Sequence, residues 1–415
     1  MIKRDIGHLG CPFFEQKLDN GLNILFMPRN SRQKSALIYV NTGSFPHDEI
    51  INSTKMPFGC AYFLEKMIMS NKTIEELAKL HTVGKSHIDY SYTCYELSSL
   101  DDIFPSIQLV LNKITHLDYT EKDIDEFKTN NRVKFLAREN NPLNIIEKTA
   151  LENLYFESPI SKGIYPTFNE SISIHASTLN RFQSRYYQSS SMTIMVSGDY
   201  SLKEANEKLL SLKVPKQLTT YSREIKYSEN YDKAREQYTE LRPANDGNYL
   251  CFGIKLPQRK KLFEAFGELT FAFYEILDEA LFRGNRFFKE GIKNCDADLL
   301  SYKIEQGGED AYILLDFHCL NSATLINFLF SYFTRPEINI DHSILKSAIA
   351  RYEAIALRNL SVPSTSLDGF AKALANNLLY PSLVNNVKTI KYKTFIDFIA
   401  MFTTFPKTTV FLPEE

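Results

Sequence analysis

The chain has 415 residues, which is enough for two or more domains that each bury their own core. Hydrophobic residues make up 44% of it and charged residues 24%, and these ordinary globular values exclude extended disorder. The formal net charge of -2 reflects 48 basic and 50 acidic residues without a concentrated basic run, so we expect no nucleic-acid partner.

The cysteine pattern and the apolar segments bear on the cellular location. Six cysteines lie singly, without a C-x-x-C pair, which is typical of free thiols in a reducing cytoplasm rather than of a disulfide framework. Residues 1–14 are interrupted by charges and do not form the apolar core of a secretory signal. Residues 325–333 are the most apolar later stretch and are too few for a membrane span. We expect a cytoplasmic protein without a membrane partner.

The first half of the chain begins with strands and then becomes helical. Asn20-Gly21 is a strong hairpin signal, and the apolar run 22–27 that follows it predicts a strand. A second strand is predicted at 35–40, and a helix from about 58 to 69 is followed by further helices. The β-rich segment 191–198 predicts the strand that closes this half.

The second half repeats this order. Residues 201–247 are polar and irregular, and the charge-rich stretch 221–235 within them predicts a helix followed by an exposed connection. A strand is predicted at 249–256. A long amphipathic helix is predicted over 263–281, and a terminal strand at 408–412.

Both halves therefore run from strand through helices to strand, which indicates an internal duplication. We expect an α+β fold of two related lobes, each with a mostly antiparallel sheet flanked by helices. The predicted organisation is an N-terminal lobe at 1–220, a linker at 221–246 and a C-terminal lobe at 247–415.

One helix carries a specific motif. Residues 59–67, GCAYFLEKM, resemble the zinc helix G-x-A-H-F-L-E-H-M of insulinase and pitrilysin type metallopeptidases. That helix contains the inverted motif H-x-x-E-H, in which two histidines bind zinc and the glutamate polarises the attacking water. Tyr62 and Lys66 stand at the two histidine positions, whereas Glu65 keeps the glutamate position.

Other segments extend the resemblance over about 14–201. Gly43-Ser44 matches the G-S that precedes the zinc helix, and 92–96, YTCYE, resembles the T-x-Y-E strand that follows it. Three later family segments, L-Y-x-x-H-P, G-T-x-E-S-I and Y-Y-x-x-S-N-M, are matched by LYFESP at 154–159, PTFNESI at 166–172 and YYQSSSM at 186–192. The chain is similar to the shorter, subunit-type bacterial members and to processing-peptidase-like proteins.

The third zinc ligand of the family is a glutamate on a later helix. Aligning Pro142 with the proline of that family segment places Lys134 at the ligand position. A protonated lysine has no lone pair for a metal, and a tyrosine with a pKa of about 10 is a poor ligand at neutral pH. The resemblance therefore implies a degenerate motif of Tyr62, Glu65, Lys66 and Lys134, with no metal, no cofactor and no catalytic residue.

The lysines have two possible placements. Lys66 or Lys134 is predicted to fill the vacant metal space and to pair with Glu65, because a buried unpaired carboxylate is costly. The alternative is that both lysines point to solvent. A replacement metal site at His81, His87 and Asp89 is less favoured, because the residues between the two histidines are typical of a loop or a strand edge.

The resemblance also suggests a role. Family members enclose a chamber between two halves, and some pair a catalytic subunit with an inactive homologue. We expect a non-catalytic subunit that binds an active homologous zinc peptidase and a peptide, such as a leader-bearing precursor, with zinc only in the catalytic partner. The family adds peptides to a sheet edge, here the strand at 88–96. Its candidate substrate-binding residues are Ile88, Asp89, Tyr90, Ser91, Tyr92 and Thr93.

Two alternatives remain open at this stage. The first alternative to the subunit is a stand-alone homodimeric peptide-binding scaffold. The second is an enzyme with altered, non-zinc chemistry at Glu65. Size in solution separates the scaffold from the subunit, and metal analysis with a Glu65→Gln assay separates the altered enzyme.

Overall fold

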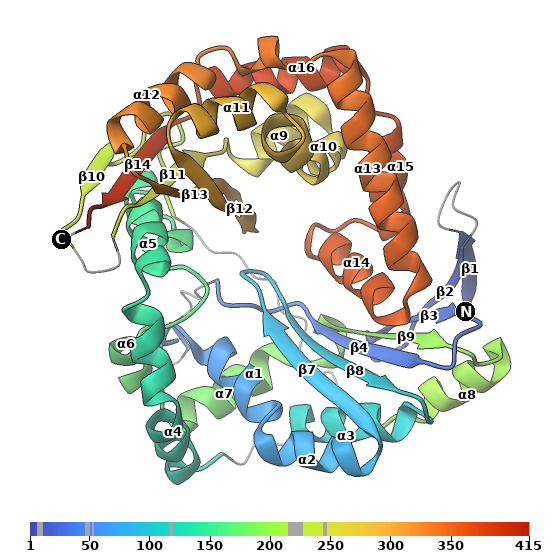
Figure 1. Ribbon diagram of the computed structural model, residues 1–415. Helices are drawn as coiled ribbons and strands as arrows, with labels where there is room; N and C mark the ends of the chain where they lie inside the picture. The colour runs from blue at the N-terminus through green and yellow to red at the C-terminus, as the bar shows by residue number, and fades with distance from the viewer. Residues whose placement is uncertain are drawn as a thin grey trace. The chain divides into compact units, whose positions relative to one another are not determined.

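The computed structural model describes residues 1–5, 11–45, 50–51, 54–115, 119–214, 227–243 and 247–414 (Figure 1). The chain divides into two compact units. The first lobe consists of Met1–Val133, Ile164–Ile225 and Ala356–Ser382, and the second lobe of Lys134–Gly163, Lys226–Ile355 and Leu383–Glu415.

The first lobe is built on a seven-stranded sheet in the order β1-β2-β3-β9-β4-β8-β7. The strands are β1 (Ile2–Asp5), β2 (Pro12–Lys17), β3 (Asn23–Pro28), β4 (Lys34–Val40), β7 (Thr82–Ile88), β8 (Thr93–Ser99) and β9 (Met192–Gly198). Only β3 and β9 run parallel among the neighbouring pairs of this sheet. The predicted hairpin joins β2 to β3, and Gly21 at its turn has a φ of 84°, which glycine adopts without strain.

Helices cover both faces of this sheet. Figure 1 shows α1, α2, α3 and α7 on one face and α14 on the other. The helices of this part are α1 (Cys60–Ile68), α2 (Asn71–Lys79), α3 (Phe104–Thr115), α4 (Glu121–Glu139, which continues into the second lobe), α6 (Phe168–Ile172), α7 (Ala176–Tyr186), α8 (Leu202–Ser211) and α14 (Pro363–Ala375). A short separate pair is formed by β5 (Ile50–Ile51) and β6 (Thr54–Lys55).

The second lobe has a five-stranded sheet in the order β10-β14-β11-β13-β12. Its strands are β10 (Tyr238–Glu240), β11 (Tyr249–Lys255), β12 (Ala297–Gly307), β13 (Asp310–Cys319) and β14 (Lys407–Leu412). The helices are α5 (Pro142–Leu154), α9 (Arg259–Phe266), α10 (Leu269–Leu277), the π-helix η4 (Asp278–Arg283), α11 (Arg286–Asn294), α12 (Ser322–Tyr332), α13 (His342–Ser361), α15 (Tyr380–Lys388) and α16 (Tyr392–Ala400), with α13 and α15 shared with the first lobe. Short 3-10 turns η2 (Pro159–Lys162), η3 (Ser189–Ser191), η5 (Pro336–Asn339) and η6 (Met401–Thr403) complete the chain.

The two sheets share one topology. In the first lobe β3 is parallel to β9, which continues antiparallel through β4 and β8 to the edge strand β7. In the second lobe β10 is parallel to β14, which continues antiparallel through β11 and β13 to the edge strand β12. This equivalence confirms the predicted α+β fold of two related lobes with mostly antiparallel sheets.

Each sheet is covered by a helix from the opposite half of the sequence. The helix α5 precedes the predicted linker at 221–246 but packs against β11, β13 and β14 of the second lobe. The helix α14 follows that linker but packs against β4, β8 and β9 of the first lobe. The two lobes therefore differ from the predicted linear division into 1–220, 221–246 and 247–415. A helix belongs to the lobe whose sheet buries its apolar face, and here that lobe is not the one in which its sequence position would place it.

Two predicted helices are different in the structure. The long helix expected over 263–281 is broken into α9, α10 and η4, and Gly267 at the break has a φ of 60°, which ends α9. The helix expected in 221–235 lies partly outside the described residues. Its described part, 227–235, is not helical. Among the described residues, every helix is too short or too polar to cross a membrane.

A buried ion pair fastens the segment 227–233 to the second lobe. Lys255 on β11 and Glu229 both have fully buried side chains, and Lys255 Nζ lies 2.5 Å from Glu229 Oε1. The ammonium also donates to the carbonyls of Leu154 at 2.9 Å and Asn230 at 2.7 Å. The Glu229 carboxylate in turn accepts the backbone N–H groups of residues 156–158. Burial raises the pKa of Glu229, but Lys255 and these N–H groups outweigh it and lower the pKa.

Candidate functional site

The candidate site is built on α1. Gly59 precedes this helix with a φ of 96°, and a Cβ atom there would lie 2.7 Å from Pro166, so glycine fits both the backbone and the packing. All residues from Cys60 to Glu65 are buried. The helix contacts β7, α3 and α7 of the first lobe. This packing places Glu65 beside Ser86 of the edge strand β7.

Glu65 is the central residue of the site and is 0% exposed. Its Oε1 accepts a hydrogen bond from Lys66 Nζ at 3.0 Å and another from Ser86 Oγ on β7. Its Oε2 is buried and has no hydrogen-bond donor. A carboxylate with one satisfied and one unsatisfied oxygen retains the capacity to accept a further donor.

Lys66 and Tyr62 stand on the same side of the helix. The Lys66 side chain is 40% exposed, and its ammonium lies 5.8 Å from the centre of the Tyr62 ring. Tyr62 is 4% exposed and packs edge-on against Tyr165, with 5.7 Å between ring centres. The Tyr62 phenol is thus a packed aromatic side chain, whereas the Lys66 ammonium is partly exposed.

The predicted pairing of a lysine with Glu65 is present for Lys66. Lys134 is exposed on α4, so this lysine fits the alternative in which the side chain points to solvent. Earlier on α4, Phe127 packs against Phe63 of α1 with 4.7 Å between ring centres. This apolar contact joins α4 to α1.

The polar layer beneath Glu65 consists of neutral groups. Tyr95 on β8 is cross-strand to Ser86, and its hydroxyl lies 3.3 Å from that of Tyr187. Burial raises the pKa of Tyr95 well above its usual value, with smaller contributions from Tyr187 and Glu65. Burial likewise raises the pKa of Tyr187 to about 12. Both phenols stay protonated at neutral pH, and Lys66 is the one cation that the structure shows on Glu65.

The donor set on α1 does not fit a catalytic zinc ion. Zinc requires imidazole, thiolate or carboxylate donors, usually three from the protein. Here one carboxylate is accompanied by a phenol and an ammonium. No group of three histidine, cysteine, aspartate or glutamate side chains suited to a metal occurs in the part of the chain that the structure describes.

The three residues considered for a replacement metal site each contact a different partner. His81 Nδ1 lies 2.7 Å from Asp101, and His87 Nδ1 lies 3.0 Å from Glu96. The Asp89 carboxylate accepts the backbone N–H of Tyr90 in the turn after β7. Burial raises the pKa of Asp89 despite that hydrogen bond.

The predicted peptide-binding strand needs a correction. Ile88 ends the edge strand β7, residues 89–92 (Asp89, Tyr90, Ser91 and Tyr92) form the turn, and Thr93 begins β8. The strand β8 pairs with both β4 and β7, so its backbone groups are already used. The placement of 88–96 at the edge was therefore wrong, and the edge itself is β7 at 82–88. Tyr90 and Tyr92 are buried at 0% and 4% exposure.

Ser86 is the site residue that the motif did not predict. It lies on the edge strand β7 and donates to Glu65 of α1. The neighbouring Lys85 and His87 point to the other face of the sheet, where both contact Glu96. Side chains alternate between the two faces of β7, so residues 84, 86 and 88 would have been predicted to share one face. The sequence did not show that α1 packs against this strand.

Removal of the Lys66 charge tests the pair. The Lys66→Met variant is expected to lower the free energy of unfolding by about 1–3 kcal/mol, because Glu65 stays buried without its cation. The expected loss of unfolding free energy is modest because the lysine is partly exposed. Urea unfolding followed by circular dichroism measures it.

Two variants control this experiment. Lys79→Met on the exposed side of α2 is expected to change stability little. The double variant Glu65→Gln/Lys66→Met is expected to recover part of the loss, because it removes the unpaired charge. A double variant that is no more stable than Lys66→Met contradicts the pairing.

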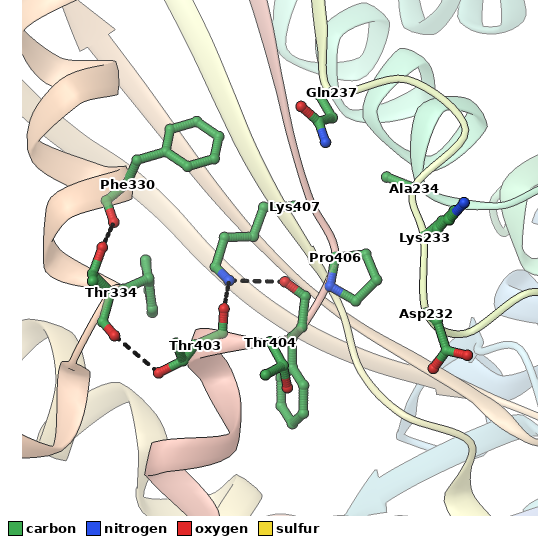
Figure 2. Close-up of a pocket in the computed structure, with 12 residues that line it drawn as sticks. Asp232, Lys233, Ala234, Gln237, Phe330, Thr334, Thr403, Thr404, Pro406 and Lys407 are labelled. Carbon is green, nitrogen blue, oxygen red and sulfur yellow. Dashed lines mark hydrogen bonds between the residues drawn. The ribbon is translucent and has the colours of Figure 1, made fainter.

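A pocket of about 610 Å³ lies within the second lobe (Figure 2). Lys407 lines it, and its ammonium donates to the carbonyls of Phe402 at 2.6 Å, Phe405 at 2.8 Å and Thr403 at 3.3 Å. Burial lowers the pKa of Lys407 to about 8. All three N–H donors are used for these carbonyls, so the ammonium caps the C-terminal end of η6 and has no N–H left for a ligand.

Comparisons with known proteins relate this fold to a group of peptidases. No protein-family model matches the sequence, and no curated protein matches it. A solved structure described as an M16-like peptidase from Alicyclobacillus acidocaldarius is similar with a TM-score of 0.83 and 17% identity, over 96% of this chain and 98% of that one. An M16 inactive domain from Pseudomonas fluorescens has a TM-score of 0.75 and 12% identity, over 97% and 99% of the two chains.

A third similar structure is longer. The periplasmic protease PqqL from Escherichia coli has a TM-score of 0.68 and 15% identity, and the match covers 96% of this chain but 47% of PqqL. At these identities the likeness shows the fold alone. The chain therefore has the two-lobed fold of M16 peptidases.

Proposed function

We propose that this chain is the non-catalytic subunit of a heterodimeric zinc peptidase and that it helps to bind and process a peptide. The observation that carries the proposal is the pairing of Lys66 with the buried Glu65 on α1, at positions where the resemblance places zinc-site residues of active peptidases. The ammonium supplies the positive charge beside the carboxylate that a metal supplies in an active relative. Hydrolysis by this chain alone is not expected.

The comparison with a longer protein supports a partner. The match covers 47% of PqqL, so in that protease the matched fold is accompanied by further chain. In the proposed complex an active homologous subunit takes the place of that further chain, and zinc is present only in that subunit. The partner subunit, its zinc and a cytoplasmic location for the complex all belong to this proposal.

The edge of the first sheet supports peptide binding. The strand β7 is paired only through β8, so its outer backbone groups are available to an extended peptide within the described structure. Strand addition uses backbone hydrogen bonds and tolerates varied side chains, as a leader-bearing precursor would require. Val83, which is 75% exposed on this strand, offers an apolar contact beside the backbone.

Reconstitution with the active homologue tests the function. The mixture is expected to cleave an extended peptide substantially faster than the homologue alone, and light scattering is expected to show a complex of one copy of each. Zinc analysis of the complex should find one ion per heterodimer. The matched control replaces the homologue by a variant that lacks its zinc-helix glutamate, and this mixture should be inactive.

Two outcomes contradict the proposal. A mixture that cleaves no faster and shows no complex excludes the subunit role. A stable homodimer that binds peptides without any partner favours the stand-alone scaffold instead.

A further inference from the structure

A pair of carboxyl groups connects the covering helix of the second lobe to its sheet. Glu147 lies on α5 and Asp316 on β13, the strand against which α5 packs, and the Asp316 carboxyl group raises the pKa of Glu147. Lys303 on the edge strand β12 forms an ion pair with Glu147. These three residues lie between α5 and the strands that it covers.

Asp316 is the more enclosed member of the pair. It is 0% exposed, and its Oδ2 accepts a hydrogen bond from Ser301 Oγ on β12. The buried thiol of Cys251 on β11 also faces it, and burial followed by Asp316 raises the pKa of that thiol. Asp316 Oδ1 is buried and has no hydrogen-bond partner. A proton on Glu147 supplies the missing donor.

The first lobe has an equivalent arrangement with a different charge count. Asp368 on its covering helix α14 faces Glu96 on β8, the strand that corresponds to β13. There Glu96 is 2.7 Å from Lys85 and 3.0 Å from His87. A lysine and a histidine thus lie at the Glu96 carboxyl group. In the second lobe, within the described residues, Lys303 is the basic side chain at Glu147 and Asp316.

We propose that Glu147 and Asp316 share a bound proton in the folded protein and that this proton controls how firmly the N-terminal part of α5 holds to the second-lobe sheet. The proton takes the place of the second basic side chain that the first lobe provides. Two carboxyl groups that interact in a buried site cannot both ionise without a large cost. Loss of the proton therefore leaves two carboxylates facing one ammonium.

The position of the pair makes α5 a hinged element. Its C-terminal end is fixed by Asn153, whose amide donates to Thr239 at 3.0 Å and Thr408 at 3.1 Å, and by the Leu154 carbonyl, which accepts from Lys255. Glu147 lies almost two turns earlier. Repulsion at this position would loosen the preceding turns while the anchored end stays in place.

The direction of the pH effect follows from Glu147. Burial raises its pKa, and Asp316 raises it further, while Lys303 offsets part of the rise, to about 7 from 4.5. A carboxyl group with a raised pKa in the folded state favours folding at low pH, and the advantage is lost as the pH rises from the unfolded value through the folded value. The helix is therefore firmly held near pH 5.5 and loosened near pH 8.

Comparison of wild type with Glu147→Gln measures this effect. The glutamine keeps the shape and a donor for Asp316 but does not titrate. Between pH 5.5 and 8, the ratio of the wild-type unfolding constant to that of the variant is expected to rise by roughly 30-fold. Hydrogen exchange over 142–152, corrected for the intrinsic rate, is expected to accelerate with pH in the wild type only.

Three controls make the result specific. Glu152→Gln changes an exposed glutamate on the same helix and should retain the wild-type pH dependence. Asp316→Asn removes the partner charge and should move the Glu147 carboxyl resonance to titrate at lower pH. An NMR titration of wild-type Glu147 near pH 4.5, or an unfolding ratio that is flat between pH 5.5 and 8, overturns the proposal.

Discussion

The variant Tyr62→His/Lys66→His is expected to bind zinc, whereas the wild-type chain is not. The two positions lie on the same side of α1, since the Lys66 ammonium lies 5.8 Å from the Tyr62 ring centre. Histidines four residues apart on one helix face reach a single ion. The double variant is expected to bind zinc at least about 100-fold more tightly than the wild type, measured by calorimetry.

Cobalt absorption spectra of the double variant provide a second readout of the geometry of the site. Each single histidine variant is the matched control. A double variant that binds no more tightly than the singles contradicts the assigned geometry of α1.

Local signals were sufficient to predict most strands and the fold class. The Asn20-Gly21 turn and the apolar runs beside it gave β3 within one residue, and the strands at 35–40, 191–198 and 249–256 correspond to β4, β9 and β11. These segments combine turn chemistry with continuous burial, so tertiary contacts reinforce the local preference. The repeated strand–helix–strand order likewise predicted two related lobes.

Long-range packing was not accessible in the same way. The exchange of α5 and α14 between the lobes depends on which sheet each apolar face covers, and amphipathic periodicity records that a face is buried but not against what. The edge position of β7 also depends on strand order. An interior strand and an edge strand of one hairpin, such as β8 and β7, have similar local patterns.

The candidate site was predictable where a motif placed residues on one helix. Tyr62, Glu65 and Lys66 were found because the helix keeps G-x-A-x-F-L-E around them. Ser86 was not found, because its hydrogen bond to Glu65 joins residues 21 positions apart. Only the packing of α1 on β7 brings these two residues together.

The largest stability effect is expected from Lys255→Met in the second lobe. Both members of the Lys255–Glu229 pair have side chains with 0% exposure, so removal of the ammonium leaves a fully buried carboxylate without its cation. The carbonyls of Leu154 and Asn230 lose the same donor. Breaking a buried pair in this way costs about 3–5 kcal/mol of unfolding free energy, which urea denaturation can measure.

The expected loss of stability comes from the buried Glu229 carboxylate that is left without a cation, rather than from the lost attraction itself. A second substitution separates these two causes. Glu229→Gln/Lys255→Met is expected to be more stable than Lys255→Met alone, because an amide is cheaper to bury than a carboxylate. Lys261→Met on exposed α9 should have little effect. The ion pair with Lys255 lowers the pKa of Glu229 in the folded protein. The contribution of this ion pair to the free energy of unfolding is therefore present above the pKa of Glu229 in the unfolded chain, and it is lost as the pH falls through the pKa of Glu229 in the folded protein. The difference between wild type and Lys255→Met should therefore shrink in acid, and a difference that stays constant down to acid unfolding would contradict the ionic origin of the effect.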